Sequence, residues 1–171
     1  MKGLILGFSL ATVGWGQMAD EYHVKAAFLF NFAKFVEWPA QSFKSPNDPI
    51  AICVMGKDPF GDALEQAVNG RTAQGRPFSL RQLTDAHQAA TCQILFVSSS
   101  ERKRLPAIFR EIKTSGVLAV GESDNFTAEG GVVNFRIEGG TVRIQINVEA
   151  AEQQQLHISS KLLGLAEIVK K

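Results

Sequence analysis

Several residue types are scarce in this 171-residue chain, and their scarcity excludes classes of function. There are two cysteines and three histidines, and their spacing fits no zinc site. Basic residues are balanced as well, with 18 lysines and arginines against 17 acidic residues, and the longest basic run is Arg102–Arg104. Because a nucleic-acid-binding surface needs a clustered basic stripe, the composition argues against nucleic acid as a partner.

Motifs for catalysis or cofactor binding are also missing. The chain has no G-x-S-x-G nucleophile turn, and Gly56-Lys57 lacks the upstream glycine of a phosphate-binding loop. The serines at 98–100 are better explained as a helix cap, because Glu101 follows Ser98 by three residues. We therefore expect no enzyme, no metal site and no cofactor.

The N-terminus has the layout of a secretory signal peptide. Lys2 precedes an apolar stretch of about 11 residues, Gly3–Val13, and small residues follow it. A membrane-spanning helix would need about 20 apolar residues, whereas Gln17 ends this run too early. The sequence predicts a signal peptide over 1–19 and an exported domain over 20–171 with no membrane insertion. An uncleaved anchor or a buried helix is the alternative.

Cys53 and Cys92 are the two cysteines of the expected mature chain. In an exported protein an even number of cysteines favours a disulfide. Such a bond would close a loop of about 40 residues, which the chain-entropy model values at about 4 kcal/mol. Two buried free thiols are the alternative.

The segment from Glu21 to Glu37 lacks glycine and proline and predicts a helix that ends before Trp38-Pro39. Its phenylalanines and its other apolar residues cover most of the helix circumference, so the helix should be buried on more than one side. Either it lies deep in the fold or a partner covers its second face. The candidate residues for contact with a partner or in a dimer are Phe28, Phe30, Phe32, Phe35 and Trp38.

The remaining periodicity alternates between strands and helices. Apolar runs predict buried strands, and Gly139-Gly140 predicts the turn of a β-hairpin. We expect a single-domain α/β sandwich: a mixed sheet with helices on both faces and a C-terminal β-hairpin plus helix. The expected strands are 50–55, 76–83, 92–97, 116–120 and the hairpin 132–147, and the expected helices are 21–37, 59–68, 99–113 and 159–170.

A row of polar side chains is expected on one face of the hairpin. Alternation places Arg143, Gln145 and Asn147 on the same face of one strand, and Asn134 and Arg136 on its partner. Such a row could bind a small anionic or sugar-like ligand. A solvated sheet face is the alternative.

Motifs along nearly the whole mature chain resemble the YfiR family. The most specific is the helical segment Lys25–Pro39. The other matching segments, in the same order as in the family, are Ile52–Gly61, Cys92–Ser98, Gly130–Phe135, Val142–Asn147 and Ile158–Leu163.

The resemblance implies a small periplasmic α/β protein that can dimerise. The characterised type binds and represses the periplasmic sensor region of an inner-membrane diguanylate cyclase, and an outer-membrane lipoprotein relieves the repression. Cys53 and Cys92 match a cysteine pair of the family, whereas a second pair found in better-known members has no counterpart near 126–134.

We therefore expect a periplasmic repressor that lowers cyclic-di-GMP signalling and biofilm formation by protein–protein contact. Phe30 or Trp38 is expected to contribute to that contact. The alternative is a periplasmic module that binds a small ligand or a cell-wall fragment and serves another membrane sensor.

Overall fold

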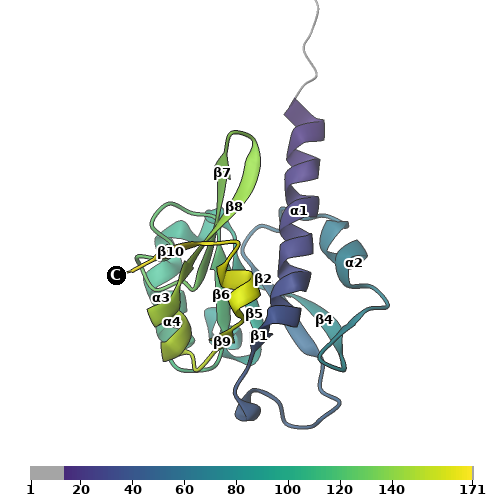
Figure 1. The fold of residues 1–171 in the computed structure, drawn as a ribbon, viewed down its shortest axis with the longest axis vertical. Coiled ribbons are helices and arrows are strands. Elements are labelled where there is room, and N and C mark those ends of the chain that lie inside the picture. The colour runs from purple at the N-terminus through teal and green to yellow at the C-terminus, as the bar shows by residue number, and fades with distance from the viewer. Residues whose placement is uncertain (1–13, 171) are drawn as a thin grey trace, which may run out of the picture.

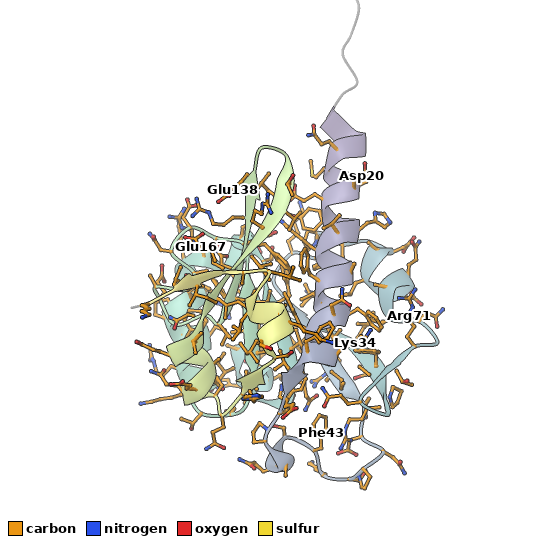
Figure 2. All side chains as sticks on the ribbon, viewed as in Figure 1. Asp20, Lys34, Phe43, Arg71, Glu138 and Glu167 are labelled. Atoms are coloured by element: carbon orange, nitrogen blue, oxygen red, sulfur yellow. A yellow bond between two sulfur atoms is a disulfide. The ribbon has the colours of Figure 1, made fainter. Side chains whose placement is uncertain are left out.

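The computed structural model describes residues 14–170 (Figure 1). Most of the predicted signal peptide lies outside the described residues. The first described helix, α1 (Gly14–Phe35), runs without interruption across Asp20, the expected first residue of the mature chain. Figure 2 shows Asp20 on the upper part of α1, well before the helix reaches the centre of the fold. Removal of residues 1–19 therefore stays a prediction.

An eight-stranded mixed sheet forms the centre of the described structure, in the order β10-β8-β7-β6-β5-β2-β4-β3. Five neighbouring strands, from β7 to β4, run parallel. β8 is antiparallel to β7 and parallel to β10, and β3 is antiparallel to β4. The strands are β2 (Ile50–Met55), β3 (Thr72–Ala73), β4 (Arg76–Leu83), β5 (Ile94–Val97), β6 (Leu118–Gly121), β7 (Val133–Glu138), β8 (Thr141–Asn147) and β10 (Glu167–Val169).

Helices cover both faces of the sheet. The long α1 and the short α2 (Ala63–Val68) lie on one face, and the 3-10 segment η2 (Ala86–Thr91) and α3 (Leu105–Glu111) pack on the other (Figure 1). Alternate residues of the central strands enter the two cores: Ile94 and Phe96 of β5 face α1, whereas Leu95 and Val97 face α3. Because alternate residues are buried in one core or the other, every position of these strands is apolar, as the continuous apolar runs predicted.

The segment after the hairpin returns to α1. It contains α4 (Val148–Gln153), β9 (His157–Ile158) and α5 (Ser160–Leu163). β9 pairs antiparallel with β1 (Val36–Glu37), the two residues that follow α1. The backbone amide of Ser159 also donates to the carbonyl of Phe35 at 2.9 Å. The C-terminal part of the chain is thereby joined to the end of the first described helix.

The predicted fold class is confirmed, and the hairpin lies where the sequence placed it. Its turn uses Gly139 and Gly140, both with positive φ (55° and 76°), as a tight type I′ turn requires. The pairing sets Asn134 opposite Gln145 and Arg136 opposite Arg143.

The predicted final helix over 159–170 is wrong in its second half. Gly164 caps a four-residue helix, α5, and the chain then extends as β10 beside β8. The apolar Leu163 and Leu165 suggested a longer helix, but Ile168 and Val169 are β-branched and pair readily with a strand that has a free edge.

Two other helices are shorter than predicted. The backbone amide of Phe60 donates to Asp58, which makes a turn, so α2 begins only at Ala63 instead of at residue 59. The helix predicted over 99–113 starts as a 3-10 segment, η3 (Ser99–Arg104), and becomes α3 where Pro106 occupies its first turn.

Cys53 and Cys92 form a disulfide, so the alternative of two free thiols is wrong. The bond joins β2 to the residue after η2, with 6.0 Å between the two Cα atoms. Both cysteines belong to the core on the α3 side of the sheet.

Candidate functional site

A cavity of about 780 Å³ opens between the first half of α1, the loop that follows β6, and the hairpin. It lies near the carboxyl ends of β5 and β6, where open α/β sheets commonly bind ligands. Most of its lining is polar. The polar side chains that line it are Glu21, Tyr22, Lys25, Ser99, Glu122, Ser123, Asp124, Asn125, Thr127, Asn134, Arg136, Gln145, Asn147 and Lys170.

A buried lysine anchors one wall of this cavity. The side chain of Lys25 is only 3% exposed, and its ammonium contacts the carboxylates of Glu21 and Glu122, the latter at 2.7 Å. Glu122 is itself only 8% exposed. Because burying a lone charge is costly, this pairing is what allows α1 to place a lysine among apolar neighbours.

Tyr22 completes the charged group. Its hydroxyl donates to Glu122 at 3.1 Å, and the Lys25 ammonium lies 4.4 Å from the centre of its ring. Burial and the neighbouring Glu122 carboxylate raise the pKa of the Tyr22 hydroxyl above its usual range. Tyr22 therefore keeps its proton and acts as a hydrogen-bond donor to Glu122.

Four of the five polar hairpin residues singled out from the sequence line this cavity: Asn134, Arg136, Gln145 and Asn147. Arg143 does not line it, although it pairs directly with Arg136. Whether any of the five binds a ligand stays a prediction.

Two of these residues also hold the loop after β6. The Asn134 amide donates to the carbonyl of Ser123 at 3.0 Å, and the Asn147 amide donates to the carbonyl of Thr127 at 3.0 Å. The side-chain oxygen of Asn147 accepts from the backbone amide of Ala150 and caps α4. Asn147 therefore has a clear structural role, since both ends of its amide group are engaged.

Asn134 differs from Asn147 because one end of its amide is free. Asn134 is 4% exposed and Ser123 is 5% exposed. Neither the side-chain oxygen of Asn134 nor the hydroxyl of Ser123 has a hydrogen-bond partner within the described residues. Both residues line the cavity, but these two oxygen atoms are themselves almost completely covered by the protein.

The aromatic residues predicted to contact a partner occupy different environments. Phe32 is fully buried between Phe28 and Phe135, so the structure places it in the core and we do not retain it as a partner-binding residue. The other four (Phe28, Phe30, Phe35 and Trp38) are half-buried.

Phe30 and Trp38 are held from one side. The Phe30 ring lies 5.6 Å from that of Phe78 on β4, with the side chains of Lys34 and Arg71 beside it, and Figure 2 labels both of these cations on the side of α1 nearest α2. The indole of Trp38 donates to the carbonyl of Gln93 at 3.0 Å, which fixes its orientation.

Sequence reasoning missed the charged wall of the cavity. Lys25 precedes Leu29, Phe32 and Val36 by 4, 7 and 11 residues, and all three are fully buried, so it lies on the buried face of the helix. A lysine on the buried face of a helix requires a buried acidic partner, and this spacing could have indicated the site. Nothing in the sequence identified Glu122 as that partner.

Within residues 14–170, no cluster of three or more histidine, cysteine or acidic side chains could hold a metal ion. No helix in the same range has both the length and the apolar character needed to cross a membrane.

The sequence of this chain matches a known protein family, and its fold matches known structures. A family model described as YfiR/HmsC-like matches residues 22–167. The chain belongs to this family. The match covers nearly all of the expected mature domain and confirms the resemblance seen in the motifs. A search of curated proteins found no match.

Two solved structures share the fold of this YfiR/HmsC-like protein. One is a conserved domain protein from Vibrio cholerae O1 biovar El Tor, with a TM-score of 0.53 and 11% identity; the match covers 71% of this chain and 55% of the other. The second is the ABC domain in complex with L-Trp from Streptococcus pneumoniae, with a TM-score of 0.57 and 11% identity over 84% of this chain and 60% of the other. The chain thus spans between half and two thirds of these two proteins, and at this identity the likeness shows the fold alone.

Proposed function

We propose that this protein is a periplasmic repressor that binds the periplasmic sensor region of an inner-membrane diguanylate cyclase and lowers cyclic-di-GMP signalling. Membership of the YfiR/HmsC-like family carries this proposal, since the family is regulatory and indicates a periplasmic regulator of diguanylate cyclase signalling. An outer-membrane lipoprotein that removes the repressor, and a second copy of the chain, are further partners in the proposal.

The disulfide supports export. Disulfides form and persist in oxidising compartments such as the periplasm, and they are rare in the cytosol. Here the two cysteines are both consumed in one bond that ties β2 to η2. Delivery by a signal peptide over residues 1–19 is therefore part of the proposal.

The α1 face supplies a surface suited to a protein partner. Phe30 and Trp38 are each fixed by an internal contact and are still accessible in part, which is the arrangement of pre-organised aromatic anchors. A specific contact needs about 800 Å² on each partner. Phe28 and Phe35 are half-buried on the same helix, and Phe28 packs toward Phe135 on β7, away from Phe78, the neighbour of Phe30 on β4.

Photo-crosslinking in the native periplasm tests this function. A photoreactive phenylalanine analogue at position 30 or 38 should capture a membrane protein with a cytoplasmic diguanylate cyclase domain. The matched control is Phe109, a half-buried phenylalanine that packs on Phe126 in the opposite layer, and it should capture none. Capture of no such sensor from either position, or equal capture from position 109, would refute the proposed contact.

The cavity favours a second candidate function, that of a module that binds a small ligand or a cell-wall fragment and serves another membrane sensor. The supporting observation is that the cavity wall consists mostly of polar side chains, four of which come from the hairpin. Native mass spectrometry of protein purified from the periplasm should then detect a retained ligand, and its loss in an Arg136→Ala variant would locate it.

A further inference from the structure

We propose that the outer edge of β4 binds an extended segment of a partner protein, which adds to the sheet as a further strand and places an acidic side chain opposite Arg81. β4 lies on the opposite side of α1 from the hairpin (Figure 1). This binding mode goes beyond the proposed contact with a cyclase and does not depend on it. The backbone groups, the apolar side chains and the charge along this edge support it.

The outer edge of β4 is open over its second half. β3 is the only strand on that side among the described residues, and it pairs with only the first two residues of β4. The carbonyl of Leu83 accepts from the amide of Gly56, so the backbone of Leu83 faces β2. Because backbone groups alternate along a strand, Leu80 and Gln82 direct their N–H and C=O groups away from β2. These four groups have no strand to pair with within residues 14–170, and the backbone of an extended chain would satisfy them.

An apolar surface borders the open edge. Leu80 is 39% exposed, and its side chain lies on the same face of the sheet as that of Phe78, which packs against the core under α1. A groove of about 640 Å³ opens beside Leu80, and its lining includes Val68, Phe78 and one charge of each sign, Glu65 and Arg71. An added strand would place an apolar side chain next to Leu80 and cover this surface.

Arg81 gives the edge a positive charge. It lies between Leu80 and Gln82, and its guanidinium donates to the hydroxyl of Thr91 at 2.7 Å but forms no ion pair among the described residues. In an antiparallel pairing that uses all four open groups, one residue of the added strand lies directly opposite Arg81, at the short separation of a non-hydrogen-bonded pair. An acidic side chain at that position is favourable, whereas a like charge is unfavourable.

The same pairing disfavours a second copy of this chain. A two-fold dimer that engages all four groups of each copy would set Leu80 opposite Gln82, and Arg81 directly opposite the same arginine of the other copy. Two arginines at that separation repel each other. The edge therefore favours a different chain, in which an acidic residue stands beside an apolar one in an extended segment.

Hydrogen exchange measured by NMR on the disulfide-bonded protein tests the open edge first. The amides of Leu80 and Gln82 should exchange quickly, whereas those of Ser79 and Arg81 should be protected by pairing with β2. Protection of all four amides in the free protein would show that the edge is already covered and would overturn the inference.

The probe for binding is the peptide acetyl-Ser-Thr-Val-Glu-Val-Thr-Ser-amide, titrated to about 10 mM because short edge contacts are weak. Bound peptide should shift the amide signals of Leu80 and Gln82 and slow their exchange severalfold. N-methylation of both valines removes the N–H groups that face β4 and should abolish binding, whereas N-methylation of the glutamate should not. No change at Leu80 and Gln82, or equal binding of the two methylated peptides, would refute strand addition.

Charge reversal tests the position of the acidic side chain. Arg81→Glu should abolish binding of this peptide and allow binding of its counterpart with lysine in place of glutamate, which the unchanged protein should not bind. The matched control is Arg143→Glu on the exposed part of the hairpin, which should alter neither result. Equal effects of the two changes would show that only net charge matters and would overturn the role of Arg81. Photo-crosslinking to a cyclase from position 30 or 38 can succeed or fail independently of these outcomes.

Discussion

The two cores on either side of the sheet are built differently. On the α1 side, aromatic rings contact one another within the core: Phe32 stacks on Phe135 with 6.0 Å between ring centres, and Phe60 meets Phe96 edge-on at 4.8 Å. On the α3 side, the core is mainly aliphatic and contains the Cys53–Cys92 disulfide. The half-buried Phe28, Phe30, Phe35 and Trp38 pack on the α1 side, whereas Phe109 is half-buried on the α3 side. One layer therefore contains a covalent bond, and the other contains more contacts between aromatic rings and more half-buried aromatic residues.

The largest expected effect comes from breaking the aromatic layer. Phe32→Ala should lower the free energy of unfolding by about 3–5 kcal/mol, because it removes a fully buried ring and leaves a cavity. Phe109→Ala is the control in the other layer and should cost less, since Phe109 is only half-buried. Urea unfolding of both variants measures the difference, and an equal cost would mean that the two layers do not differ in this way.

Removing the Cys53–Cys92 disulfide should destabilise the layer on the α3 side of the sheet. A Cys53→Ser, Cys92→Ser double variant frees a loop closed over a sequence separation of 39 residues, and the chain-entropy model gives a loss of about 4 kcal/mol at most. Hydrogen exchange should show that protection falls more in η2 and α3 than in α1. Uniform loss of protection across both layers would show that the disulfide stabilises the domain as a whole and not one layer.

The buried lysine is the polar exception in the aromatic layer. Lys25→Met should cost about 3 kcal/mol, because it leaves the buried Glu122 carboxylate without its cation. A Lys25→Met, Glu122→Gln double variant should recover part of that loss, since no uncompensated charge remains. Chemical unfolding of the single and double variants gives the coupling between the two residues, and strictly additive effects would contradict the pairing.

The smallest expected effect appears only at alkaline pH. Tyr22 is the single tyrosine of the chain, so tyrosinate absorbance reports on it directly. Its pKa is raised in the folded state, so the folded protein retains a proton that the unfolded chain loses near its ordinary value of 10.0. The stabilisation is therefore complete below pH 10 and declines as the pH rises further. Tyr22→Phe should remove this decline, and tyrosinate formation in the folded protein with an ordinary midpoint would contradict the buried contact with Glu122.

Much of the sheet could be predicted from local pattern. The runs at 50–55 and 76–83 coincide with β2 and β4, because buried strands need continuous apolar residues and half-buried strands alternate. The prediction of a helix over 159–170 was wrong because the structure of this segment depends on a strand distant in sequence. Residues 167–169 form a strand because they pair with the edge of β8, and no local pattern in the segment indicates that pairing.

One wall of the candidate site could likewise be predicted from the sequence, and the other could not. Alternation along the hairpin was enough to group Asn134, Arg136, Gln145 and Asn147, because residues two apart on a strand share a face. The opposite wall could not be foreseen, since Glu122 approaches Lys25 across 97 residues of sequence. Such a contact is a product of the tertiary fold and not of local periodicity.

The pairing of β1 with β9 has a consequence for the order in which the protein folds. Val36 faces Ile158, a residue 122 positions later, so α1 cannot complete its packing until nearly all of the chain is present. Contacts of such long range form late and slow the folding reaction. A chain of this topology therefore completes the packing of α1 only when the residues around Ile158 are available to pair with it.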